Sequence, residues 1–260
     1  MKAHSNRRSR NQRWRGRLLS ITTFVVLLLL WEAAVVSMHV RPVMLPAPSD
    51  ILYELWHDTA WYLSNAGYTL LTTMAGFILS VLIGVAVAVL LVSLPWFENA
   101  IYPVIVSVNS VPKVAIAPLF VVWLGTGAEP QIAIAFLIAV FAIIVDSAHG
   151  FRSIPPDVAD LGRVLKGSPV DLFFKIRLPC ALPSILAGMK VSISLALVGA
   201  IVGEFVASQR GLGYIILSAQ GSFDTARAFA ALFLLAAMGV MLFSAVESLE
   251  RRLTHWRHLS

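Results

Sequence analysis

Ionisable and proline residues inside long apolar runs are the residues of this chain that could do chemistry. Lys113 lies between Pro112 and Pro118 in one apolar run, and Glu204 lies near the end of another. A charge in lipid is costly, so each is a candidate for contact with a solute or for an internal ion pair. Proline removes a backbone donor and invites a kink, which lipid tolerates only where protein or a water-filled cavity covers it. We therefore predict a path or gate role for Lys113, Pro112, Pro118 and Glu204.

Other roles are open for these charges. Besides attracting an anionic solute, Lys113 could pair with a carboxylate such as Glu204 or Asp146, or its ammonium could snorkel to the interface. Glu204 could contact solute or brace an external gate. Lys190, close to the inner face, is expected to snorkel, and Glu32 is expected to pair within the protein.

Two pairs of glycines indicate tight bends or close packing. Gly211 and Gly213, in QRGLGYI, permit a sharp bend, which would suit an outer gate or a plain surface turn. Gly76 and Gly84 are too far apart for a GxxxG motif and are expected to let helices pack closely.

The composition indicates a membrane protein. Of the 260 residues, 58% are hydrophobic and only 13% are charged, against about 25% charged in soluble domains. A single soluble core of this length could not bury so much apolar surface. One cysteine, Cys180, excludes an intrachain disulfide. The chain has neither an HExxH zinc motif nor a GxxxxGK[ST] phosphate loop, so it is not expected to hydrolyse ATP.

Six apolar runs predict six transmembrane helices, because lipid leaves the backbone no other hydrogen-bond partner. They cover about residues 18–38, 67–94, 100–124, 131–149, 183–207 and 227–249. The first run is longer than the 7–15 apolar residues usual in a signal peptide and lacks an A-x-A cleavage site, so we expect it to be retained. The rest of the predicted division is a basic tail (1–17), an external loop (39–66), a five-span core (67–249) with an internal loop (150–182), and a second tail (250–260).

Lysine and arginine predict the orientation. The N-terminal tail holds seven of them, the loop after the fourth span five and the C-terminal tail three, against three in the external loops. Both termini and the 150–182 loop are therefore expected in the cytoplasm. The external 39–66 segment begins with prolines, with Ser49 as the expected N-cap of an amphipathic helix. That helix could meet an external partner or lie on the bilayer.

The internal loop has the pattern of two short helices. The first is expected to open at Pro155-Pro156 and stop at Gly167. The second is expected to start at an N-cap, Ser168, and to end at Leu178-Pro179. Exposed apolar residues among charges suggest a docking site for another protein, and a solvated connector is the alternative.

This loop resembles the cytoplasmic coupling loop of binding-protein-dependent ABC importer permeases. Their pattern is Glu-Ala-Ala, three residues, Gly, nine residues, Ile, one residue, Leu-Pro. The spacing fits, with Asp, Leu and Gly in place of Glu-Ala-Ala, and with Lys in place of the glycine, which follows one residue later. The candidate coupling residues are Asp160, Leu161, Gly162, Arg163, Lys166, Gly167, Ile176, Leu178 and Pro179.

Three more segments, LPAPSDIL, SVPKVAIAPLFVVWLGTG and GEFVASQRGLGYII, are similar to the nitrate, sulfonate, taurine and bicarbonate branch of these permeases, which has relatives that import thiamine or riboflavin precursors. The resemblance implies an all-α, type I ABC importer permease (MetI-like) fold in a bacterial inner membrane. It implies a homodimer, two ATPase subunits that bind ATP and Mg, and an external binding protein that delivers a small polar or anionic solute. It implies neither an enzyme nor a nucleic-acid partner.

Two other classes of protein compete with a permease. An ATP-independent solute or ion channel would need no docking loop. An intramembrane enzyme would need paired aspartates, a histidine cluster or a Ser-Lys arrangement at membrane depth, and the sequence has none of these at plausible depth.

Overall fold

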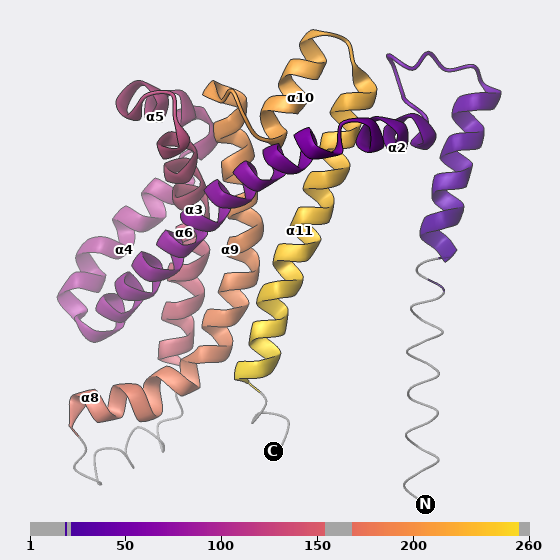
Figure 1. The fold of residues 1–260 in the computed structure, drawn as a ribbon. Helices are drawn as coiled ribbons and strands as arrows, with labels where there is room; N and C mark the ends of the chain where they lie inside the picture. Colours follow the sequence, from indigo (N-terminus) through magenta and orange to yellow (C-terminus); the bar gives the residue numbers. More distant parts are fainter. Residues whose placement is uncertain (1–18, 20–21, 154–167, 255–260) are drawn as a thin grey trace, which may run out of the picture. The chain divides into compact units, whose positions relative to one another are not determined.

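The computed structural model describes residues 19, 22–153 and 168–254, and the regular structure within these ranges is helical (Figure 1). A helix of residues Thr22–Ser37 comes first. The elements that follow are α2 (Pro48–His57), α3 (Thr59–Ser93), α4 (Pro95–Ser110), the short 3-10 helix η1 (Lys113–Ile116), α5 (Ala117–Leu124), α6 (Ala128–Arg152), α8 (Pro169–Leu172), the π-helical segment η2 (Phe173–Arg177), α9 (Leu178–Ala207), α10 (Leu212–Gly221) and α11 (Thr225–Leu253).

Four helices are long and apolar enough to cross a membrane: α3, α6, the continuous helix Val170–Ala207, and α11. A fifth candidate is the pair formed by α4 and the segment Lys113–Leu124, whose axes meet at 83°. The described helix Thr22–Ser37 is shorter than the roughly 20 residues that a span needs. The described residues therefore contain four spans, or five if the bent pair is one, and six spans remain a prediction.

Two element boundaries differ from the sequence-based prediction. The helix that holds the second span begins at Thr59, not at residue 67. The short helix after Ser168 was predicted to end at Leu178-Pro179, and this is wrong, because helical structure continues through both residues into α9. Pro179 lies in the first turn of α9, where a proline loses no helical hydrogen bond. Figure 1 shows that the chain changes direction between α8 and α9.

The chain divides into two compact units. The first comprises Met1–Thr59 and Ser218–Ala230. In it the Glu32 carboxylate accepts hydrogen bonds from the hydroxyl of Ser49 at 2.7 Å and from its backbone N–H at 3.0 Å, which confirms that Glu32 is paired within the protein. Ser49 was predicted to be the N-cap of this helix, and this is wrong. Ala47 takes that position, and its N–H donates to the Asp50 carboxylate at 3.1 Å.

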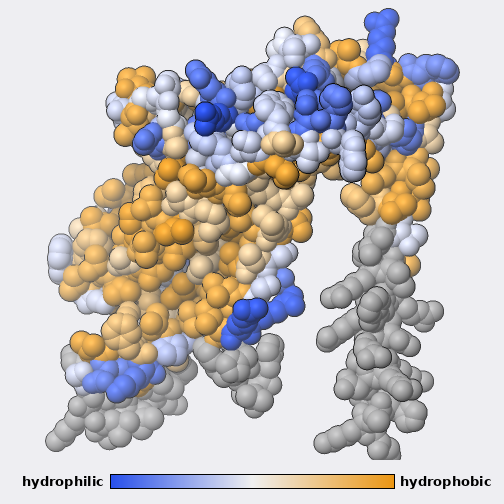
Figure 2. Space-filling view, in the orientation of Figure 1, coloured by the Kyte–Doolittle hydropathy of each residue, from blue (hydrophilic) through white to orange (hydrophobic). Residues whose placement is uncertain are grey.

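The second unit comprises Ala60–Leu217 and Ala231–Ser260, and α6 and α9 form its most extensive helix contact. Small residues let α3 approach α6, as the sequence predicted. A Cβ on Gly76 would lie 2.5 Å from the Ala135 Cβ, and one on Gly84 would lie 2.7 Å from Ile143 Cγ2. Hydrophobic side chains cover the flank of this unit, while hydrophilic ones gather at its α8–η2 end (Figure 2).

Candidate functional site

The bent pair of α4 and the segment Lys113–Leu124 carries Lys113 at its break. Pro112 precedes η1 and lies at the bend, whereas Pro118 lies in the first turn of α5, where its missing N–H breaks no helical bond. The Lys113 ammonium donates to Asn109, at 2.7 Å from Oδ1 and 3.1 Å from the carbonyl oxygen. It also lies 4.7 Å from the centroid of the Phe141 ring, a cation–π distance. Asn109 and Phe141 are thus the partners of this charge.

The structure excludes one of the alternatives for Lys113 in the described part of the chain and gives Lys190 a partner. Lys113 pairs with neither Glu204 nor Asp146, because Asn109, one helical turn away, satisfies its ammonium. The Lys190 Nζ lies 2.7 Å from the Glu250 carboxylate on α11. Since Glu250 opens the predicted cytoplasmic tail, snorkelling of Lys190 toward the inner face stays a prediction. Both members of that pair are half-buried, so the contact ties α9 to α11.

Glu204 is fully buried near the end of α9, and both of its carboxylate oxygens accept hydrogen bonds. The Thr69 hydroxyl donates to one at 2.8 Å, and the Gly213 N–H donates to the other at 2.7 Å. The Thr69 oxygen in turn accepts the Leu212 N–H at 2.9 Å, and Asn65 Oδ1 accepts the Gly211 N–H at 2.8 Å. Three consecutive N–H groups at the start of α10 are therefore held by side chains of α3 and α9.

The predicted bend at Gly211 and Gly213 is confirmed. Gly211 has a φ of +103°, which strains a residue with a side chain, and a Cβ there would collide with the Glu204 carboxylate. A Cβ on Gly213 would lie 2.9 Å from Glu204 Cβ. The two glycines allow the turn to close onto the buried acid.

At the opposite end of the second unit, α8 begins at a side-chain cap. The Asp171 N–H donates to the Ser168 hydroxyl oxygen at 3.1 Å, and the Ser168 hydroxyl donates to the Asp171 carboxylate at 2.6 Å. This confirms the predicted N-cap. Of the candidate coupling residues, Ile176, Leu178 and Pro179 lie in η2 and the start of α9, whereas residues 160–167 lie outside the described residues.

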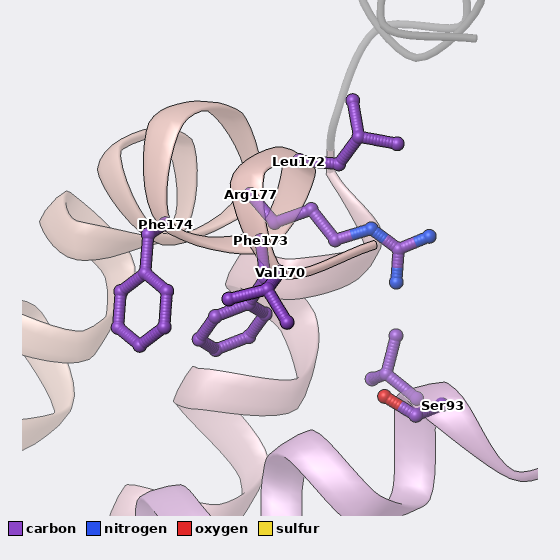
Figure 3. Close-up of a pocket in the computed structure, with 7 residues that line it drawn as sticks. Ser93, Val170, Leu172, Phe173, Phe174 and Arg177 are labelled. Carbon is purple, nitrogen blue, oxygen red and sulfur yellow. The ribbon is translucent and has the colours of Figure 1, made fainter. Parts of the chain in front are cut away.

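A cavity of about 510 Å³ separates this segment from the end of α3. Figure 3 shows the Arg177 side chain extending toward the end of α3 that carries Ser93, with Val170 beside Phe173. Phe173 is half-buried and stacks on Phe151 at 5.8 Å between ring centroids. Val170 and Phe174 are 65% and 60% exposed. Two large apolar side chains thus remain uncovered beside Lys175 and Arg177.

The fold has a close counterpart among solved transporters. The chain superposes on a chain of the structure described as inward-facing conformations of the MetNI methionine ABC transporter, with a TM-score of 0.67 and 20% identity, over 75% of this chain and 97% of that chain. The described residues contain no cluster of three or more metal-binding side chains. The fold and the apolar helices together define an all-helical membrane protein.

The family follows from the sequence comparison. Residues 80–255 match the family described as binding-protein-dependent transport system inner membrane component, and the chain belongs to it. It is 30% identical to the formylaminopyrimidine transport permease protein of Halalkalibacterium halodurans, over 90% of this chain and 94% of that protein. It is 32% identical to the riboflavin transport system permease protein of Chloroflexus aurantiacus, over 90% of this chain and 88% of that protein. It is 29% identical to the taurine transport system permease protein of Escherichia coli, over 95% of this chain and 94% of that protein.

Membership of this family confirms the resemblance seen in the sequence. The chain is the inner-membrane component of a binding-protein-dependent ABC importer, a transport subunit and not an enzyme. Such a component works with ATPase subunits and a substrate-binding protein.

Proposed function

We propose that this chain forms half of the path by which a small polar or anionic organic solute enters the cell. The support is the set of relatives, which are named for formylaminopyrimidine, riboflavin and taurine. Lys113, Pro112, Pro118, Glu204, Gly211 and Gly213 are the proposed path and gate residues. A second copy of the chain completes the path, and each copy binds one ATPase subunit that carries ATP and Mg.

The α8–η2 segment, together with residues 160–167, is the proposed docking surface for the ATPase. Exposed Val170 and Phe174 offer an apolar anchor, and Lys175 and Arg177 beside them offer charges that can orient a partner. Uncovered apolar side chains ringed by charge are typical of protein contacts.

One observation supports coupling from this surface to the outer gate. The helix Val170–Ala207 is continuous, and Glu204, near its far end, holds the turn at Gly211–Gly213 through the Gly213 N–H. The helical structure turns between α8 and α9 without a break, so we expect displacement of α8 by an ATPase to pull on the start of α9, which packs along α6 and can carry the motion to that turn. The proposed cycle is a rocking of this helix that opens the path alternately to each side.

The proposed topology has six spans, with the first at 18–38, and both termini in the cytoplasm. The proposed division keeps a basic tail at 1–17, an external segment at 39–66, a core at 67–249 with its coupling loop at 150–182, and a tail at 250–260. The excess of Lys and Arg in the tails and the coupling loop supports this orientation.

Phe174→Ala tests the docking surface. Loss of an anchoring aromatic side chain typically costs about 2 kcal/mol or more, so we expect at least a tenfold loss of co-purified ATPase and of ATPase stimulation by the binding protein. Both are measured on the purified complex in nanodiscs. Leu249→Ala, another exposed apolar residue at the cytoplasmic end of α11, is the matched control and should change neither. Full co-purification and stimulation with Phe174→Ala would remove α8–η2 from the docking surface.

A further inference from the structure

A second cavity, of about 280 Å³, lies at the end of the second unit that holds Glu204. Its walls come from α3, from the loop before α6, from α6 itself and from the turn after α9. The lining residues used below are Tyr68, Thr126, Gln131, Ser208, Gln209 and Arg210. Thr126, Ser208, Gln209 and Arg210 lie in segments that carry the family resemblance, whereas nothing in the sequence drew attention to Tyr68 or Gln131. Since liquid water takes about 30 Å³ per molecule, the cavity has room for roughly nine waters or a small solute of similar size.

Gln131 is the unusual residue of this cavity. It is 1% exposed, and its Oε1 atom has no hydrogen-bond partner among the residues that the structure describes. It is packed against α9, where a Cβ on Gly203 would lie 2.8 Å from the Gln131 Cα. An unpaired buried acceptor costs about 1–3 kcal/mol, so native proteins keep one mainly where a ligand or ordered water completes it.

Arg210 supplies the only formal charge among the lining residues. Its backbone is held by the Ser208 hydroxyl, which accepts the Arg210 N–H at 3.2 Å and donates to the Arg210 carbonyl oxygen. The next N–H, of Gly211, is held by Asn65. Among the described residues no carboxylate lies within ion-pair distance of the Arg210 guanidinium, and both oxygens of nearby Glu204 are occupied by Thr69 and Gly213. The backbone of Arg210 is therefore fixed, and its exposed guanidinium is not neutralised by a carboxylate among the described residues.

We propose that this cavity binds a small solute that carries both an oxyanion and a hydrogen-bond donor. Arg210 pairs with the oxyanion, with the hydroxyl of Tyr68 and the Gln209 amide as further donors. Gln131 Oε1 accepts the hydrogen bond of the solute's N–H or O–H group. The inference rests on the proposed permease function and deepens it, because this cavity becomes the first stop of the solute after delivery.

Thiol labelling tests this binding without any transport step. Thr126, an exposed residue at the edge of the cavity, becomes the single thiol in Thr126→Cys/Cys180→Ser. The full chain in nanodiscs is reacted with a sulfonate-bearing and with a trimethylammonium-bearing methanethiosulfonate reagent. One charge pair near a protein surface is worth enough to change a rate about tenfold. We therefore expect the anionic-to-cationic rate ratio at residue 126 to exceed, by about tenfold, that of Ser64→Cys/Cys180→Ser, an exposed α3 position outside the cavity.

Two further variants separate the roles of Arg210 and Gln131. Arg210→Gln should reduce the rate ratio at residue 126 to the Ser64→Cys value, and Arg210→Lys should keep it. Excess 2-aminoethanesulfonate should slow labelling of residue 126 more than ethanesulfonate does, and Gln131→Leu should abolish that difference. Unchanged labelling at the Ser64→Cys position shows that each variant is folded.

Equal rate ratios at residues 126 and 64, or no protection by either sulfonate, would overturn the inference. That result would leave the permease assignment intact, because labelling needs neither the ATPase nor the binding protein. Conversely, failure of Phe174→Ala to affect ATPase binding would contradict the docking proposal and leave the cavity untouched.

Discussion

Glu204 and Lys113 are each held by hydrogen bonds to uncharged partners and not by one another. Glu204 is satisfied by Thr69 and Gly213, and Lys113 by Asn109. Breaking a buried pair normally strands the remaining charge, so a Lys113–Glu204 pair would have made the two residues strongly interdependent. Because Glu204 and Lys113 have separate partners, we expect each to contribute to stability independently of the other.

Glu204→Ala and Lys113→Met should therefore have additive effects on stability. Glu204→Ala removes the acceptor of the Gly213 N–H and the Thr69 hydroxyl, and we expect it to cost about 1–3 kcal/mol of unfolding free energy. Thermal midpoints of both single variants and the double variant, measured in detergent, give the coupling energy. Independent sites couple by less than about 0.5 kcal/mol, so a coupling above about 1 kcal/mol would show that the two side chains do communicate.

At the scale of elements, the approach of α3 to α6 depends on the absence of side chains at particular positions. A Cβ on Gly76 would lie 3.0 Å from the Phe136 backbone nitrogen and 3.1 Å from the Ile132 carbonyl oxygen, neither of which can rotate away. For Gly67, on the same helix, no described atom beyond its own stretch of helix lies within 4 Å of where its Cβ would lie. Two glycines of one helix thus differ completely in their surroundings.

Gly76→Val should destabilise the protein, because α3 must move away from α6 to admit the side chain. Overpacking of this kind costs typically about 1–3 kcal/mol, which should lower the thermal midpoint by several degrees. Gly67→Val is the matched control and should leave the midpoint nearly unchanged. Fluorescence-detected gel filtration after heating measures both. Equal midpoints for the two variants would contradict the close approach of the helices.

At the scale of the whole molecule, charge asymmetry predicts the orientation in the membrane. With Cys180→Ser as the background, single cysteines at Ser5 and Ser260 should react with a membrane-impermeant maleimide only after permeabilisation. Asp58→Cys should react in intact cells, because the positive-inside rule places the 39–66 segment outside. Labelling of either terminus in intact cells would exclude a six-span topology with both ends inside.

The sequence alone determined the helical class, the main apolar spans and the family, because lipid leaves a backbone no other hydrogen-bond partner and because the motifs lie in order along the chain. It also predicted local features that depend on neighbours in the sequence, such as the Ser168 cap and the bend at Gly211.

Only the tertiary structure decided which distant side chains meet. The Glu204–Thr69 bond joins residues 135 apart, and the Lys190–Glu250 pair joins α9 to α11. The cavity lined by Gln131 and Arg210 forms only because α3, α6 and α9 come together at one end of the second unit. Such contacts depend on how each helix is rotated and how closely it packs. Helix rotation and packing distance depend on the steric fit between two helices, as where Gly203 meets Gln131, and the pattern of residues within one helix does not show that fit.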